Sequence, residues 1–183
     1  MEIKTILVPY DFSEHSTQAL IWALGFAEHW GAKVALFNVV SLFTRAPDPD
    51  GMFVLDLPRI EAEMVAGAEH QLRNLAVAKE SPAVKVECKA VVGDPFWEIC
   101  QEAEREHADL IVMGSHERTG LSHGLLGSVA ERVVRHAPCP VLVARLPQPA
   151  KWSQSRLSDP SIGLSFTALL SGSDGPPSTL PSR

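Results

Sequence analysis

The chain has 183 residues, 45% of them hydrophobic, which suits one domain with a sizeable core plus an extension. Its 16 lysines and arginines stand against 22 acidic residues, and this formal net charge of -6 argues against a nucleic-acid partner. No apolar run approaches the roughly 20 residues of a membrane helix, and the N-terminus lacks the pattern of a signal peptide. We therefore expect a cytoplasmic protein with no membrane partner.

The first part of the chain predicts a strand, a helix and a second strand. Residues 5–9 form a short apolar run rich in branched side chains, typical of a strand buried on both faces, and Asp11 lies at or just beyond its end. Ser13 suits the N-cap of a helix whose apolar residues recur at helical spacing until Gly31. Residues 33–40 predict the second strand, and the segment that follows, up to residue 57, reads as a connection.

The second part continues the alternation. A helix is predicted over residues 60–78, then a strand over 84–92 whose alternating pattern favours a place near a sheet edge, with its polar face in solvent. Asp94 suits an N-cap and Pro95 the first position of a third long helix, which ends near His107. Residues 110–113 predict a strand, 128–137 a helix and 141–144 a last strand.

Such alternation predicts an α/β fold, a doubly wound parallel sheet with helices on both faces. Ligands of this fold bind beyond the carboxyl ends of the strands, where the strand order reverses. If the first and fourth strands are neighbours there, Asp11 and the segment 114–128 face each other across one crevice. We assign the domain to residues 1–145, because residues 146–183 are rich in Pro, Ser and Gly and predict a flexible tail.

The segment 114–128 has the order strand, glycine loop, helix start. The first N–H groups of a helix have no partner within it and carry the positive end of its dipole, so a phosphate can bind there. Ser128 followed by Glu131 also matches a capping box, which would fix the helix start without any ligand. Both interpretations are open on the loop alone.

Other patterns carry less weight. Gly120 to Gly124 matches the Gly-x-Ser-x-Gly elbow of serine hydrolases around Ser122, but it does not follow directly on a strand. A Walker A site needs a lysine directly before Ser128, and the residue there is Gly127. Asp11 suits a ribose hydroxyl, an adenine amino group or a magnesium ion, and equally a capping role beside Ser13. Cys88, Cys100 and Cys139 are widely spaced and predict buried thiols.

These residues together resemble the universal stress protein family. Val-Pro-Tyr-Asp-Phe-Ser at residues 8–13 is similar to its opening strand. Residues 112–116, 125–130 and 138–143 are similar to its closing half. The resemblance spans residues 1–145 and implies a five-stranded sheet of order 3-2-1-4-5. It also implies a homodimer in which the strand at residues 141–144 pairs with its copy, which would cover an apolar sheet edge.

The resemblance further implies a site for ATP or AMP, with magnesium as the candidate metal ion. Nucleotide-binding members carry a glycine pattern that Gly114, Gly127 and Ser128 match, whereas Glu117 stands where a glycine is usual. Asp11 would contact the adenosine, the backbone at Val39 or Val40 the adenine, and the glycine segment the phosphates. The residues so implied are Pro9, Tyr10, Asp11, Val39, Val40, Met113, Gly114, Ser115, His116, Gly124, Gly127, Ser128 and Val129.

The leading functional hypothesis is a cytosolic stress-response protein in which a bound adenine nucleotide regulates conformation or partner choice. No nucleophile and base stand out, so at most slow ATP hydrolysis is expected. Because a carboxylate at Glu117 would repel a polyphosphate, a nucleotide-free dimeric interaction module of the same family is the alternative. A hydrolase using Ser122, or a flavoprotein of similar architecture, ranks third.

Overall fold

The computed structural model describes residues 2–41, 56–79, 83–115 and 126–146. The elements follow one another as β1 (Thr5–Pro9), α1 (Glu14–Trp30), β2 (Lys33–Val40), α2 (Leu57–Lys79), β3 (Val86–Val92), α3 (Pro95–Arg105), β4 (Leu110–Gly114), α4 (Ser128–His136) and β5 (Val141–Ala144). The predicted alternation of strands and helices is confirmed. The Gly-x-Ser-x-Gly pattern, Glu117 and the predicted tail from residue 147 onward lie outside the described residues.

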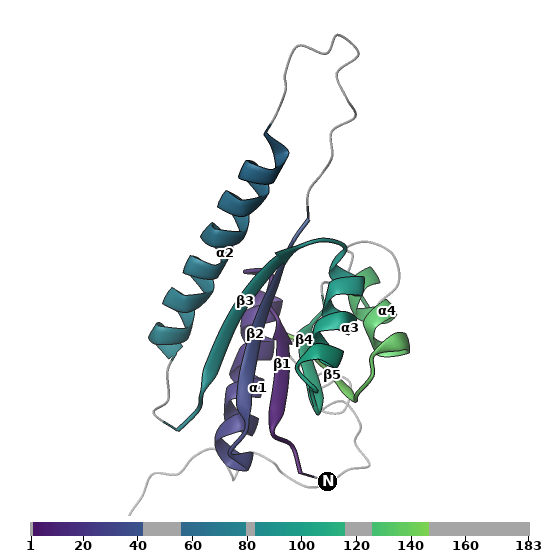
Figure 1. Cartoon of the computed structure of the whole chain (residues 1–183). Helices are drawn as coiled ribbons and strands as arrows, with labels where there is room; N and C mark the ends of the chain where they lie inside the picture. Colours follow the sequence, from purple (N-terminus) through teal and green to yellow (C-terminus); the bar gives the residue numbers. More distant parts are fainter. Residues whose placement is uncertain (1, 42–55, 80–82, 116–125, 147–183) are drawn as a thin grey trace, which may run out of the picture. The chain divides into compact units, whose positions relative to one another are not determined.

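The five strands form one parallel sheet in the order β3-β2-β1-β4-β5 (Figure 1). This confirms the expected order and makes β1 and β4 neighbours, with Ile6 opposite Leu110. The strand order therefore reverses between β1 and β4. Ligands of doubly wound folds bind beyond such a reversal, at the carboxyl ends of the strands.

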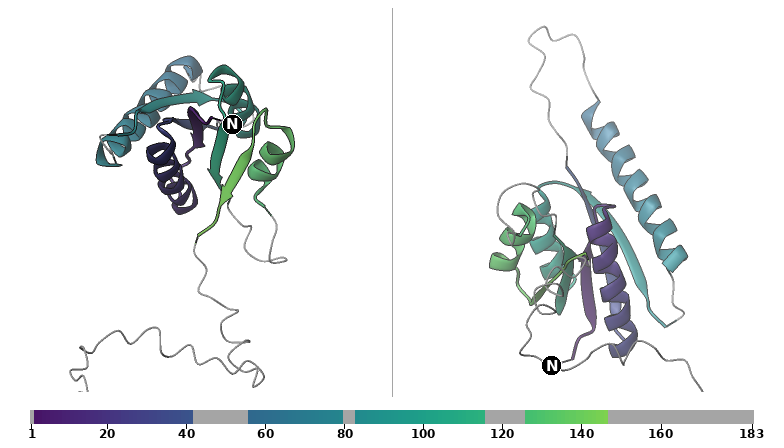
Figure 2. Two further views of the ribbon diagram at one scale, coloured as in Figure 1. Left: turned by 90° about the horizontal axis from the view of Figure 1, so that it is seen from below. Right: turned by 180° about the vertical axis from the view of Figure 1, so that it is seen from behind.

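Helices cover both faces of the sheet, as predicted, with α1 and α2 on one face and α3 and α4 on the other (Figure 2). Alternate residues of β1 belong to the hydrophobic cores on the two faces of the sheet. Ile6 and Val8 belong to the core beneath α1 and α2, whereas Leu7 belongs to the core beneath α3 and α4. A strand buried on both faces needs an unbroken apolar run, which explains the composition of β1.

Local signals set the ends of two helices where the sequence predicts them. The Ser13 side chain accepts a hydrogen bond from the Ser16 backbone N–H at 3.2 Å and caps α1. Gly31 ends the same helix with a φ of 66°, a conformation that favours glycine. At α3, Asp94 Oδ1 accepts from the Trp97 backbone N–H at 3.0 Å, and Pro95 is the first helical residue.

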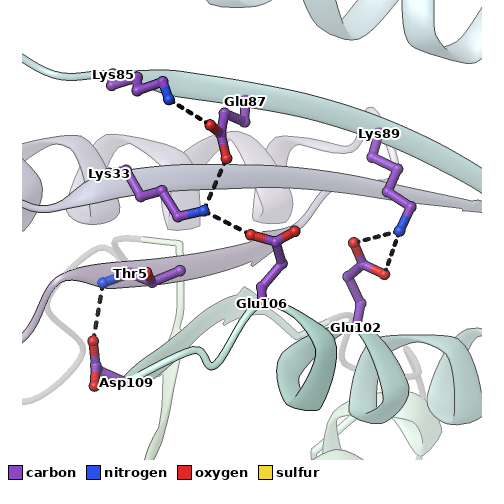
Figure 3. A network of polar contacts seen from close by, with 8 residues as sticks. All are labelled: Thr5, Lys33, Lys85, Glu87, Lys89, Glu102, Glu106 and Asp109. Carbon is purple, nitrogen blue, oxygen red and sulfur yellow. Dashed lines mark hydrogen bonds and ion pairs between the residues drawn. The ribbon is translucent and has the colours of Figure 1, made fainter.

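The polar face of the edge strand β3 departs in part from its prediction. The Glu87 and Lys89 side chains are 41% and 45% exposed, but both are tied into ion pairs on the face that carries α3 (Figure 3). Lys33 Nζ lies 2.9 Å from a Glu87 oxygen and 2.7 Å from one of Glu106. Lys89 Nζ lies 2.7 Å from Glu102, whose side chain is only 2% exposed. The prediction missed this buried carboxylate.

Candidate functional site

A cavity of about 350 Å³ lies at the carboxyl ends of β1, β2 and β4. Its walls are the ends of these strands and the first turns of α1, α3 and α4. The cavity therefore occupies the reversal between β1 and β4, where this fold class binds ligands. Its volume falls within the range of small-molecule sites.

The cavity brings together most of the residues singled out in the sequence. Those that line it are Pro9, Tyr10, Asp11, Val39, Met113, Gly114, Ser115, Gly127, Ser128 and Val129. Val40 is not among the lining residues, and His116 and Gly124 lie outside the described residues. The crevice expected between Asp11 and the glycine segment is thus present on the described part of that segment.

Sequence reasoning missed several members of the lining. They are Ser13, His15, Ser16, Phe37, Asn38, Ser41, Pro95, Ile99 and Ala130. Asn38 had a signal, because it is a polar residue inside an apolar strand. It is buried, and its side-chain amide donates to the Tyr10 carbonyl at 2.7 Å. The Tyr10 backbone N–H donates to the Phe37 carbonyl at 2.8 Å, so this wall of the cavity is held by both strands.

The N-terminus of α4 differs from the other two helix starts at the cavity. The starts of α1 and α3 are closed by Ser13 and Asp94, whereas Gly127 is the N-cap of α4 and no side chain caps it. The predicted capping box is therefore wrong. Gly127 takes the extended cap conformation (φ -58°, ψ 151°), which moves Ser128 into the first helical position. Gly127, Ser128 and Val129 line the cavity, and among the described residues no side chain caps the first N–H groups of α4.

Ser115 fixes the start of α4 relative to the end of β4. Its hydroxyl oxygen accepts from the Gly127 backbone N–H at 2.9 Å, and the Ser115 side chain is buried. A short helix such as α4 depends on tertiary contacts for its stability. This hydrogen bond therefore holds the uncapped helix end beside the strand end.

Gly114 has a structural role that the resemblance did not imply. A Cβ added to Gly114 would lie 2.5 Å from the carbonyl carbon and 2.6 Å from the carbonyl oxygen of His15. Both atoms belong to the backbone of α1 and cannot move aside as a flexible side chain does. The missing side chain of Gly114 thus allows α1 to approach β4, whatever else the backbone of Gly114 contacts.

Asp11 occupies the rim of the cavity. Its Oδ1 accepts from the Ser13 backbone N–H at 3.1 Å, so Asp11 holds the residue that caps α1 but does not itself cap the helix. Asp11 is also exposed and lines the cavity. Phe12, between these two residues, has a φ of 65°, an unusual conformation for a residue with a side chain.

The described lining of the cavity offers few charged side chains, so backbone dipoles determine much of its electrostatic potential. Asp11 is the only carboxylate and His15 the only imidazole of the described lining, which contains no lysine or arginine. An anion in this cavity would be stabilised by helix N-termini rather than by a lining cation. Within the described ranges no cluster of three or more His, Cys, Asp or Glu is placed to hold a metal ion.

The three cysteines are free thiols, of which Cys100 is buried and Cys88 and Cys139 are half-buried. Burial raises the pKa of each thiol above its usual value, so none is activated as a thiolate.

Among the described residues, no helix is long and apolar enough to cross a membrane.

The strand order and the cavity at its reversal define a doubly wound α/β protein whose cavity lies at the strand ends, where this fold class binds its ligands. The sequence profile of the universal stress protein family matches residues 2–145. Universal stress protein MJ0531 of Methanocaldococcus jannaschii is 37% identical over 147 residues, which cover 79% of this chain and 84% of the relative. The chain belongs to the universal stress protein family.

Solved structures agree with this assignment. The structure of the hypothetical protein MJ0577, from the same organism, matches with a TM-score of 0.66 at 33% identity, covering 81% of this chain and all of the other. A universal stress protein in complex with cAMP matches with a TM-score of 0.57 over 79% of this chain and 98% of the other. Its identity is 23%, so this second likeness is one of fold.

Proposed function

We propose that the chain binds an adenine nucleotide, ATP or AMP, in the cavity between β1 and β4, and that the bound nucleotide regulates its conformation or its choice of partner. One observation carries the proposal: the start of α4 lines a cavity at the strand-order reversal, and no side chain of the described residues caps it. Such a helix end favours a phosphate through its dipole and its donors. The cytosolic location and the stress response expected from the sequence stay predictions.

The lining suggests how the parts of a nucleotide would be held. The backbone N–H groups of Ser128 and Val129, with the Ser128 hydroxyl, would bind phosphate. Asp11 would accept from the ribose hydroxyls, and the backbone at Val39 would contact the base. Magnesium usually binds one or two carboxylates together with substrate phosphates, and Asp11 supplies one such carboxylate.

A proline substitution tests the backbone contact directly. Ser128→Pro deletes one N–H donor and the hydroxyl, whereas Ser128→Ala deletes only the hydroxyl. Proline is well tolerated at the first helical position, and the extended ψ of 151° at Gly127 suits a residue before proline. Since hydrogen bonds to a charged group contribute about 1.5–3 kcal/mol each, calorimetry should show ATP binding about tenfold weaker in Ser128→Ala and at least tenfold weaker again in Ser128→Pro.

Thermal unfolding of the two variants is the control, because both should keep the stability of the native chain. If Ser128→Pro and Ser128→Ala bound ATP equally well, the Ser128 backbone N–H would not contribute to the site.

As an independent measurement, protein purified without added nucleotide can be denatured and its released small molecules chromatographed. An adenine nucleotide near one per chain supports the proposal, and its absence together with no calorimetric heat at millimolar ATP would refute it.

We also propose a homodimer formed through β5. This strand is at one end of the strand order and pairs only with β4 in the described sheet. Val141, Leu142 and Val143 remain half-buried although all three are apolar. Pairing with a second copy would satisfy the open backbone edge and cover these side chains. Sedimentation velocity should give twice the chain mass, and a monomer at all concentrations would contradict the dimer.

The alternative, a nucleotide-free interaction module, rests on Glu117. Replacement of this residue by the usual glycine separates the two functions. If the native chain binds no ATP and Glu117→Gly does, the family site is intact and the carboxylate alone has abolished binding, by repelling the phosphates. If neither chain binds ATP, the nucleotide proposal is wrong for this protein.

A further inference from the structure

Arg132 contacts the start of α3, which contributes Pro95 to the cavity lining. Arg132 follows Ser128 by four residues, so both side chains lie on one side of α4, and helical side chains point back toward the N-terminus. The Arg132 guanidinium contacts Asp94 and Phe96, the two neighbours in sequence of Pro95, which lines the cavity. Arg132 therefore lies between the start of α3 and the middle of α4, and its side chain can extend toward the α4 start.

The two contacts of Arg132 differ in strength. Its Cζ lies 4.0 Å from the centroid of the Phe96 ring, a cation–π contact that orients the guanidinium while its N–H donors remain at its edge. Its Nη1 lies 3.7 Å from Asp94 Oδ2, and the two side chains are 54% and 56% exposed. Such a long, solvated ion pair contributes little, so a phosphate can replace the carboxylate at small cost.

We propose that Arg132 binds the terminal phosphates of the nucleotide and makes the site selective for a polyphosphate, ATP rather than AMP, with Asp94 as its competing partner in the empty protein. This inference rests on the proposed nucleotide function. It supplies the cation that the described lining lacks. Phe96, whose ring also contacts the His136 ring at 5.4 Å between centroids, keeps the guanidinium in place when Asp94 is released.

The test uses a cycle of variants in the full chain: Arg132→Gln, Asp94→Asn and the double substitution. Asparagine caps a helix about as well as aspartate, so Asp94→Asn removes the competing charge and keeps the start of α3. Calorimetry with ATP, AMP and adenosine, each with magnesium at low salt, gives the affinities. Arg135→Gln is the matched control, because it removes an equal charge from α4 at a residue paired with Glu131.

Arg132→Gln should weaken ATP about tenfold, AMP much less and adenosine not at all, since one charge-assisted contact is lost. Asp94→Asn should strengthen ATP about threefold, the double variant should resemble Arg132→Gln, and Arg135→Gln should leave the ratio of ATP to adenosine affinity unchanged. Equal losses for all three ligands in Arg132→Gln would overturn the inference, because Arg132 would then only hold α3 against α4. No gain in Asp94→Asn would also overturn it.

Failure of the underlying function has a different result. If the native chain binds ATP more tightly than adenosine and Arg132→Gln keeps the same ratio of affinities, only the role of Arg132 is wrong. If the native chain and Asp94→Asn bind none of the three ligands, the nucleotide proposal itself is wrong and the role of Arg132 falls with it.

Discussion

The polar groups at the two ends of the sheet differ in whether their partners belong to the chain. Near the amino ends of the strands, polar groups pair with one another (Figure 3). The Asp109 carboxylate accepts from the backbone N–H groups of Lys4 and Thr5 at 2.8 Å and 3.0 Å, and Lys33 bridges Glu87 and Glu106. At the carboxyl ends, the start of α4 lines a cavity, and no side chain of the described residues caps it.

This difference separates stability from binding. Hydrogen bonds and ion pairs completed within the chain stabilise the fold, whereas donors left at a cavity can stabilise a ligand. Substitutions among the paired groups should therefore change the free energy of unfolding, and substitutions at α4 should change affinity. Three further predictions test whether effects on unfolding free energy and effects on ligand affinity belong to opposite ends of the sheet.

Gly114→Ala should break the division, because Gly114 lines the cavity and yet supports the fold. Its new Cβ would meet the backbone of His15 at 2.5 Å, and overpacking against backbone should cost about 3 kcal/mol in the free energy of unfolding. Urea denaturation measures the change. Gly25→Ala is the control: a Cβ at Gly25, within α1, meets nothing within 4 Å and should stabilise by about 0.5–1 kcal/mol. An unchanged midpoint for Gly114→Ala would contradict the contact.

Lys89→Met should confirm that the paired groups act on stability. The substitution leaves the Glu102 carboxylate buried with Arg105, at 3.2 Å, as its remaining cationic partner. Breaking a buried pair costs about 3–5 kcal/mol, and the exposure of Lys89 and the remaining Arg105 reduce our expectation to about 2 kcal/mol. The double variant Lys89→Met with Glu102→Leu should regain most of this loss in urea denaturation. If the double variant is less stable than Lys89→Met, the buried charge is not the cause.

The smallest expected effect is a dependence on pH. Hydrogen bonds from Lys85 and then Lys33 lower the pKa of Glu87 to about 2 from an ordinary value of 4.5. The stabilisation by Glu87 is therefore complete above pH 4.5 and is lost as pH falls toward 2. Because Glu87 is partly exposed, the effect is modest. Glu87→Gln should flatten the decline of unfolding free energy as pH falls from 4.5 toward 2, whereas Glu63→Gln, at an exposed residue of α2, should leave it unchanged.

Sequence patterns predicted the features that depend on neighbouring residues. The caps at Ser13 and Asp94 and the end of α1 at Gly31 each follow from two to four consecutive residues, and all three are confirmed. The strand order needed the family resemblance, because apolar runs do not specify which strands are adjacent. That order placed Asp11 opposite the glycine segment.

Features that depend on distant residues escaped prediction. Glu102 belongs to a polar position of a helical pattern, and its burial depends on Lys89, thirteen residues earlier on another element. The need for glycine at Gly114 depends on α1, about a hundred residues away in the chain. The capping box failed for a local reason: Gly127 and Ser128 both suit an N-cap, and the sequence does not decide between them.

The hydrogen bond between Ser115 and Gly127 has a consequence for how this protein can evolve. It joins two points twelve residues apart in the chain, and both residues line the cavity. The Ser115 hydroxyl is buried, so its loss would leave the Gly127 N–H without this acceptor and would change the position of the α4 start relative to β4. A mutation at position 115 would therefore act on the fold and on the cavity together, which restricts the side chains that evolution can place there to those that keep an acceptor.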